Sequence, residues 1–206
     1  MTEPMAAVAI DRIQRTHGWL LKVTSELPGD GLARRFASTA PPIGWHLWHI
    51  TRWADRIQAT FPNHSFGATH RWDPGRQIWF RERLAEGWGL EASALGILQA
   101  GAGMTDEAAA RLPARIPGDG LQAYARQAFG ALDGIVKGLG ARDLIEGRNS
   151  VMEFTMDAVG VRATETPGAE TTVAADLAFH LSHASRHLGS IEALRGLLEI
   201  PGTATL

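Results

Sequence analysis

Apolar residues recur at helical spacing in four long segments of the chain. The segments run from about Ala6 to Leu27, Ile43 to Phe61, Gly120 to Leu139 and Thr171 to Leu198. In each segment, apolar positions three and four residues apart form a stripe along one side of a helix with 3.6 residues per turn. Proline or glycine follows three of these stripes closely and ends the helical pattern. The pattern therefore predicts four amphipathic helices.

The connections between these segments carry weaker patterns. Residues 62–118 are irregular, with short helices expected over Gln77–Glu86 and from Thr105 to Leu112. Thr105 is followed by two acidic residues, which is typical of a capped helix start. Residues 140–170 are ambiguous, and Val151–Val161 could form a strand or a short helix.

Because no convincing series of strands is present, the sequence predicts an all-α fold. We expect a four-helix bundle with long connections and short accessory helices. The connections are too long for the simplest up-down-up-down arrangement. A length of 206 residues is most simply a single domain over 1–206, with residues 62–118 as an irregular insertion within it.

Composition narrows the possible partners. Apolar residues make up 45% of the chain and charged residues 20%, which is typical of a globular protein. A formal net charge of −2 gives no electrostatic reason to expect nucleic acid or an anionic membrane as a partner. The first residues lack the basic start of a secretory signal, so a cytoplasmic location is expected.

The chain contains no cysteine. This excludes disulfides, zinc-finger cages, thiolate nucleophiles and iron–sulfur ligation by this chain. A bound metal would need His, Asp or Glu ligands, which favours Zn, Ni, Fe or Mn as a divalent ion. Thiol chemistry would need a thiol from outside.

Three histidines share one face of the last predicted helix. His180, His183 and His187 fall within about 60° of one another, on the stripe expected to be buried. A buried polar group without a partner costs about 1–3 kcal/mol, so imidazoles in a core need hydrogen bonds or a metal. The i, i+4 pair His183/His187 has the spacing with which two imidazoles bind one ion.

A second histidine pair lies at the start of the second predicted helix. By periodicity, His46 is nearer the centre of the apolar stripe, and His49 lies on its flank beside Trp53. Periodicity alone therefore slightly prefers His46 as the inward group. The remaining histidines have no partnered spacing and are expected to be incidental: His17, His64 and His70.

Other polar and aromatic residues near the histidines are candidates for supporting roles. Metal-bound imidazoles need an acceptor for their second nitrogen, for which the candidates are Asp176, Glu153 and Glu192. Three arginines near the histidines could bind a carboxylate, but a solvated surface position is expected of each: Arg52, Arg56 and Arg186. Most of the seven tryptophans are expected to pack in the core.

The sequence resembles the DinB/YfiT-like superfamily of metal-dependent enzymes, a group unrelated to the DNA polymerase that shares the name. The resemblance rests on Trp48-His49-Ile50 and on the His-x-x-His-x-x-x-His-x-Gly element ending at Gly189. It covers most of the chain, including the first helix. The middle segments Leu84–Leu90 and Gly103–Glu107 look like those of larger members.

The resemblance implies a three-histidine metal site. Carried over by position, the ligands are His49, His183 and His187, which overrules the periodicity preference for His46. His46 and His180 are then expected to line the pocket or to support the ligands. Gly189 matches a family glycine whose missing side chain would permit close helix approach.

The leading hypothesis is a divalent-metal enzyme that activates water or an external low-molecular-weight thiol against a small-molecule electrophile. Three neutral ligands leave an open coordination position, as in catalytic sites. The alternative is a non-catalytic, metal-stabilised or ligand-binding bundle, in which His46 or His180 closes the coordination sphere. A metal-free dimer with histidines at the interface is a third interpretation. A homodimer is also expected from the many tryptophans and because bundle relatives commonly pair, although no residue in the sequence fixes an interface.

Overall fold

Four long helices dominate the computed structural model, which describes residues 3–61, 69–70, 73–157 and 160–203, with the backbone alone for residues 69–70 and 150–169. The helices are α1 (Glu3–Ser25), α2 (Ile43–Thr60), α6 (Gly118–Lys137) and α8 (Val173–Gly196). Their bounds agree with the apolar segments to within a few residues. The all-α bundle predicted from the sequence is confirmed.

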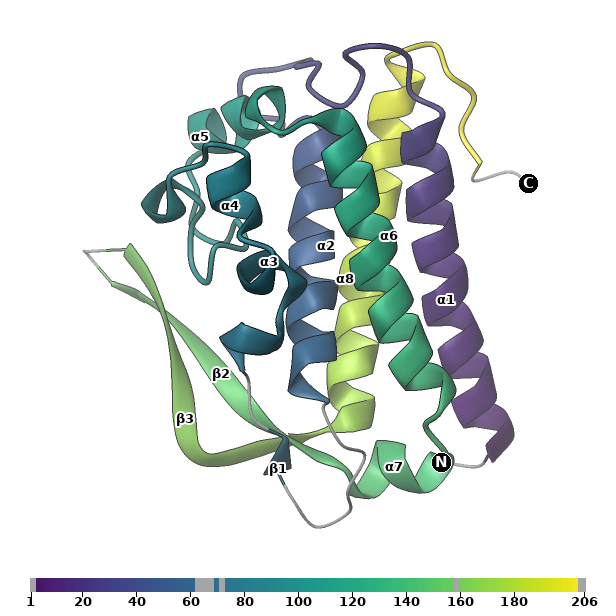
Figure 1. Cartoon of the computed structure of the whole chain (residues 1–206). Helices are drawn as coiled ribbons and strands as arrows, with labels where there is room; N and C mark the ends of the chain where they lie inside the picture. The colour runs from purple at the N-terminus through teal and green to yellow at the C-terminus, as the bar shows by residue number, and fades with distance from the viewer. Residues whose placement is uncertain (1–2, 62–68, 71–72, 158–159, 204–206) are drawn as a thin grey trace.

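The four helices form a closed square in which each helix packs against two others. Helix α2 packs against α6 and α8, and α1 completes the square between the same two helices. In Figure 1, α1 and α8 run in one direction while α2 and α6 run in the opposite one. The order along the chain is therefore up-down-down-up. Because α2 and α6 are parallel, the connection between them must return along the length of the bundle, which is why it is long.

The connection from α2 to α6 folds into short helices on the outer side of α2 (Figure 1). These helices are η1 (Pro74–Arg76), α3 (Ile78–Arg81), α4 (Leu84–Gly87), η2 (Ala92–Ala94), α5 (Asp106–Arg111) and η3 (Leu112–Arg115). Thr105 caps α5 by accepting a hydrogen bond from the backbone of Ala108, as its sequence context predicts.

The single helix predicted over Gln77–Glu86 is wrong. Arg83 has a left-handed backbone with φ of 51°, so the chain breaks into α3 and α4. At the start of α3, the backbone N–H groups of Ile78 and Trp79 donate to the buried carboxylate of Asp55 on α2. A contact with α2 therefore caps the first of the two short helices.

The second long connection contains a β-hairpin that the sequence pattern did not resolve. It begins with the short α7 (Ala141–Glu146), which is followed by β2 (Arg148–Asp157) and β3 (Gly160–Thr172). The two strands pair antiparallel, and the two-residue β1 (Thr69–His70) pairs parallel with β2. The described residues of the ambiguous segment, 151–157 and 160–161, are extended, and the hairpin reaches away from the bundle in Figure 1.

Helix α2 is the most enclosed element, because the accessory helices cover the side that a bundle helix usually turns to solvent. Fifteen of its 18 residues are buried, including Arg52 and Asp55. An element buried on all sides has no single apolar stripe, so its periodicity does not report which side faces the bundle centre. In the described parts of the chain, no helix is long and apolar enough to span a membrane.

Candidate metal centre

Two adjacent antiparallel helices bring the predicted ligands together. His49 lies in the second turn of α2, and His183 and His187 lie on consecutive turns of α8. The three side chains are 6%, 8% and 8% exposed. Because residues four apart lie on one face of a helix, the α8 pair is preorganised, and the packing of α2 against α8 adds His49.

The ring nitrogens converge at distances that suit a shared ion. Nε2 of His183 lies 3.2 Å from Nε2 of His49 and 3.0 Å from Nε2 of His187. One ligand atom of each residue lies within 4.8 Å of those of the other two. Two nitrogens bound to one tetrahedral zinc at 2.0–2.1 Å would lie about 3.3 Å apart, so little movement is needed to bind a divalent ion.

The hydrogen bond of His49 Nδ1 determines whether His49 Nε2 can bind an ion. Nδ1 lies 2.5 Å from the backbone carbonyl of Ala100, and a carbonyl oxygen can only accept. His49 Nδ1 therefore carries the hydrogen. In the neutral ring, Nε2 then presents a lone pair to the other two histidines.

His46 is the hydrogen-bond partner of the second ring nitrogen of His187. The two Nδ1 atoms lie 2.9 Å apart, and the tautomers of the two rings decide which of them donates. With an ion on Nε2 of His187, its Nδ1 would carry the hydrogen and donate to His46.

If all three imidazoles are neutral and no ion is bound, the short nitrogen–nitrogen contacts in this cluster cannot all be hydrogen bonds. His183 Nε2 carries at most one hydrogen, which the lone pair of His49 requires, so it can satisfy only one of its two short contacts. Protonation of a second ring is disfavoured, because burial lowers the pKa of His187 to about 2, of His49 to about 3 and of His183 to about 4. A bound cation is the arrangement that satisfies all three lone pairs.

The loop that supports His49 is itself held by a buried ionic network. Arg52 is 1% exposed and donates to the backbone carbonyls of Gln99 and Leu98, at 2.9 and 3.2 Å, next to Ala100. It also donates to Asp55, which is fully buried. The expectation of a solvated Arg52 is wrong, since this side chain anchors the carbonyl that orients a candidate ligand.

Gly101 allows that loop to approach α2 closely. Its φ of +88° favours glycine, and a Cβ there would lie 2.8 Å from Nδ1 of His49 and 3.0 Å from Trp48. Sequence reasoning missed both this glycine and Ala100. No spacing rule could have found a backbone carbonyl some 50 residues away from His49 along the chain. The only local signal was the nearby set of glycines at positions 96, 101 and 103.

One expectation about the surroundings is wrong, and two of the three candidate acceptors bond to other residues. A Cβ added at Gly189 would meet no atom within 4 Å, so this glycine makes no close helix contact. Asp176 accepts from Asn149, at 2.6 Å, and Glu192 bonds to Thr203, so neither carboxylate supports a ligand. The side chain of Glu153 lies outside the described residues, as do those of His64 and His70.

The two remaining candidate histidines have different places. His46 supports His187 through its ring nitrogen, as expected of a residue beside the ligands. His180 is 1% exposed and points to His17 on α1, with 2.9 Å between their Nε2 atoms. His17 is therefore not incidental, because it is buried and partnered. Neither His46 nor His180 belongs to the convergent group among the described residues.

Aromatic rings and one cation surround the three histidines. Trp45 stacks on His49, with 4.7 Å between ring centroids and 9° between planes. Phe179 contacts His183 and is 57% exposed, so it forms a solvent-facing edge of the site.

The positive charge of the exposed Arg186 lowers the pKa of all three ligands further, and no carboxylate contributes to those shifts. The site therefore favours anions.

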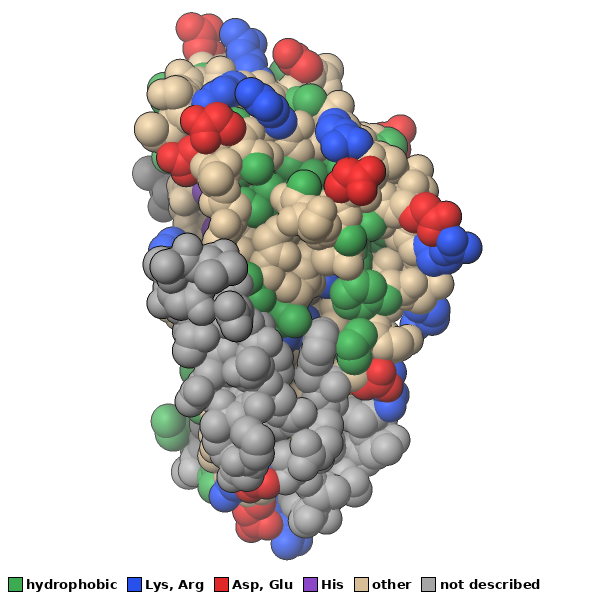
Figure 2. Space-filling model, turned by 90° about the vertical axis from the view of Figure 1, so that its left-hand side faces the viewer, with side chains coloured by type: hydrophobic (Ala, Val, Ile, Leu, Met, Phe, Trp, Pro, Cys, Tyr) green, Lys and Arg blue, Asp and Glu red, His purple; other side chains and the backbone are tan. Residues whose placement is uncertain are grey.

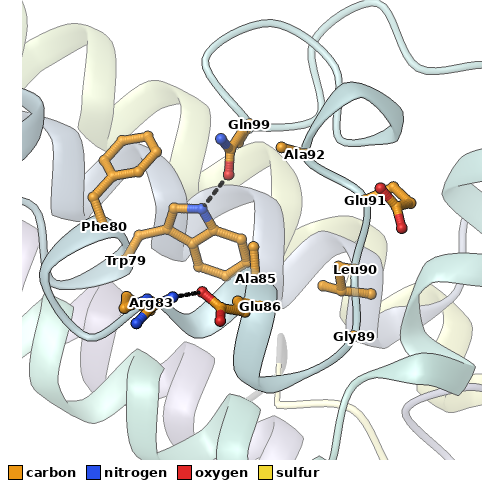
Figure 3. A pocket seen from close by; sticks show the side chains of 10 residues that line it. All are labelled: Trp79, Phe80, Arg83, Ala85, Glu86, Gly89, Leu90, Glu91, Ala92 and Gln99. Carbon is orange, nitrogen blue, oxygen red and sulfur yellow. Dashed lines mark hydrogen bonds and ion pairs between the residues drawn. The ribbon is translucent and has the colours of Figure 1, made fainter.

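A separate pocket of about 460 Å³ lies in the accessory region, and none of the three histidines lines it (Figure 3). Trp79 forms one wall and donates to Gln99, at 2.7 Å, while Arg83 is already paired with Glu86.

On the face shown in Figure 2, histidine is visible only in a narrow area, consistent with the burial of the candidate ligands.

Comparison with known proteins adds no assignment: no model of a known protein family matches the chain, and no curated protein sequence matches it with significant similarity.

Proposed function

We propose that the protein is a metal-dependent enzyme of the DinB/YfiT-like group, in which His49, His183 and His187 bind a divalent ion. The observation that supports this most directly is the convergence of three ring nitrogens, with the lone pair of His49 fixed by the hydrogen bond to the Ala100 carbonyl. Imidazole ligands suit Zn, Ni or Fe, with Mn less favoured. The ion would supply Lewis acidity to a bound water or thiol.

The residues around the ligands support activation of an anionic nucleophile. Neutral ligands leave the full charge of a divalent ion uncompensated, and Arg186 adds a further positive charge. Such surroundings lower the free energy of a hydroxide or thiolate relative to its neutral acid. Because the chain has no cysteine, a thiolate would come from an external low-molecular-weight thiol. Hydrolysis and thiol transfer to a small electrophile are both compatible with this site.

Metal content tests the first part of the proposal. Protein purified without an affinity tag is expected to bind about one divalent ion per chain, and the double variant His183→Ala/His187→Ala to bind none. His46→Gln is the matched control, since glutamine can still accept from His187 and should leave the stoichiometry unchanged. Equal metal content in the wild type and the double variant would refute the proposed site.

Ligand binding distinguishes an enzyme from a metal-stabilised scaffold. In protein reconstituted with Co²⁺, a small thiol is expected to add a sulfur-to-cobalt charge-transfer band, because an open position accepts it. The matching alcohol should add none. A spectrum that no added ligand changes would favour the non-catalytic alternative, and assays with thiol-transfer and ester substrates would follow a positive result.

We also propose that two copies of the chain form a homodimer through the outer surface of α1 and α7. Met5 and Val8 on α1 are 61% and 60% exposed, and Ile145 on the adjoining α7 is 42% exposed. Exposed apolar side chains on neighbouring elements suit an interface between two copies. Sedimentation equilibrium would detect it, and a monomer at all concentrations would exclude it.

A further inference from the structure

A second buried network crosses the bundle beside the metal centre. His17 on α1 joins Asp133 on α6 to His180 on α8, with 2.7 Å between His17 Nδ1 and Asp133 Oδ1 and 2.9 Å between the two Nε2 atoms. Both imidazoles are 1% exposed, whereas the Asp133 side chain is 26% exposed. The network therefore runs from the surface of α6 into the interior.

Each hydrogen bond in this network determines the next. The Asp133 carboxylate accepts from His17 Nδ1, so Nε2 of the neutral His17 ring is an acceptor. His180 Nε2 must then donate to it, and Nδ1 of His180 keeps a lone pair. Phe129 stacks on His17, with 4.4 Å between ring centroids, and holds the ring in this orientation.

The inner end of the network is an unpartnered proton acceptor. Nδ1 of His180 is buried and has no hydrogen-bond partner among the described residues. The other three nitrogens of the His17 and His180 rings are hydrogen-bonded, and a buried polar atom without a partner costs about 1–3 kcal/mol. A transient proton donor would give this atom a function.

The metal centre lies on the same helix as this acceptor. His180 comes three residues before the ligand His183 on α8, and residues at this spacing share one face of a helix, so a hydrogen-bonded water between the two would carry the proton. The ligands cannot accept the proton themselves, because their Nε2 atoms face the ion. With the ion bound, the outer nitrogens of His49 and His187 are already donors.

We propose that Asp133, His17 and His180 form a proton relay between the metal centre and the surface of α6. The inference rests on the proposed function, since the proton is the one that a bound water or thiol loses. It enters at His180 Nδ1, the Nε2 hydrogen of His180 passes to His17 Nε2, and the Nδ1 hydrogen of His17 passes to Asp133. One N–H bond forms on each ring as another breaks. The reverse sequence would return a proton to the group that leaves the small electrophile.

The test measures how fast the bound nucleophile ionises in protein reconstituted with Co²⁺. After a rapid jump from about pH 6 to about pH 8, across the range expected for metal-bound water, the cobalt spectrum reports the ionisation. Asp133→Asn keeps an acceptor for His17 but cannot take its proton. We expect it to retain full cobalt content and the same final spectrum, with a rate at least about tenfold lower.

Two comparisons separate a relay from a structural role. Added imidazole buffer should restore the rate in Asp133→Asn, because an external base replaces the missing path. Asp119→Asn, which removes an exposed carboxylate from the same helix, should leave the rate unchanged. His17→Gln interrupts the same path at its centre and should slow ionisation equally.

The outcomes distinguish this inference from the proposed function. Wild-type rates in Asp133→Asn at full cobalt content would overturn the relay while the metal site stands. Loss of cobalt from Asp133→Asn would also overturn it, since the residue would then be needed for binding. Nitrogen-15 spectra of the protein should show hydrogen on Nδ1 of His17 and Nε2 of His180, and the opposite tautomers would exclude the proposed direction.

Discussion

His46 and His49 show how two similar residues in one helix acquire different tasks. Both are buried, but only His49 directs a lone pair toward the α8 pair, while His46 is the hydrogen-bond partner of His187 Nδ1. With an ion on Nε2 of His187, His46 would accept the hydrogen bond from Nδ1. Partners of this kind orient metal ligands and raise their basicity.

Replacing His46 with phenylalanine should weaken metal binding without abolishing it. The change removes the acceptor for His187 Nδ1, for which we expect an affinity about 10–100-fold lower at unchanged stoichiometry. Competition with a chromogenic chelator measures this affinity. Complete loss of metal would instead identify His46 as a ligand, and an unchanged affinity would show that its hydrogen bond has no effect on the site.

Gly101 should affect the metal site although it carries no side chain, because it lies against the ligand His49. Alanine at this position would contact His49 at 2.8 Å and require a left-handed backbone. We expect Gly101→Ala to weaken metal affinity about 10–100-fold and to lower the free energy of unfolding by about 1–3 kcal/mol.

The control for this change is Gly130→Ala on α6, where an added Cβ meets no atom within 4 Å. Alanine in a helix interior is favoured over glycine by roughly 0.5–1 kcal/mol, so this variant should be slightly stabilised and should bind metal normally. Calorimetry with and without metal measures both variants. Equal behaviour of the two would contradict the role given to Gly101.

At the scale of elements, α2 connects the accessory region to the site through Arg52. Its guanidinium contacts Asp55, Tyr124, Gln77 and the backbone of residues 98 and 99. The loop that bears Ala100 is therefore fixed to the same helix as His49. The accessory helices contribute to the site by this route rather than by supplying a ligand among the described residues.

Arg52→Met should destabilise the protein strongly. It leaves the buried carboxylate of Asp55 without its cation, and breaking a buried ion pair costs about 3–5 kcal/mol. Urea denaturation measures the loss, and hydrogen exchange should accelerate in residues 95–101 beyond the global effect. Arg15→Met removes an exposed ion pair with Asp11 and should cost less than about 1 kcal/mol. Similar losses in both variants would refute the network's role.

At the scale of the whole molecule, five of the buried histidines make the free energy of unfolding depend on pH. Burial lowers the pKa of each below its usual value: His46, His49, His180, His183 and His187. In the unfolded chain they take up protons near pH 6.5, whereas in the folded chain they remain neutral. The unfolded state then binds more protons, so stability falls as the pH decreases through this range.

We expect the metal-free protein to lose stability between about pH 7 and pH 5. Each histidine that is neutral when folded contributes up to about 1.4 kcal/mol per pH unit. Chemical denaturation at a series of pH values, with a chelator present, measures the slope. Between about pH 8 and pH 9 the slope should vanish, because histidines are neutral in both states. Constant stability from about pH 8 to pH 5 would contradict the burial of neutral imidazoles.

The sequence by itself determined the four long helices and the His183/His187 pair. Both follow from spacing along one helix, since residues three and four apart share a face whatever surrounds them. The prediction of His49 as a ligand came from a family resemblance, because periodicity preferred His46. That preference failed because the accessory helices bury α2 on almost every side.

Only the tertiary structure decided how the helices face one another. The partners of Ala100, Arg52, His17 and Asp133 lie up to 163 residues away along the chain, and each meets its partner only after separate helices have packed. Spacing fixes the angle between two side chains about one helix axis. The rotation of each helix about its own axis depends on the packing of the whole core, and no local pattern records it.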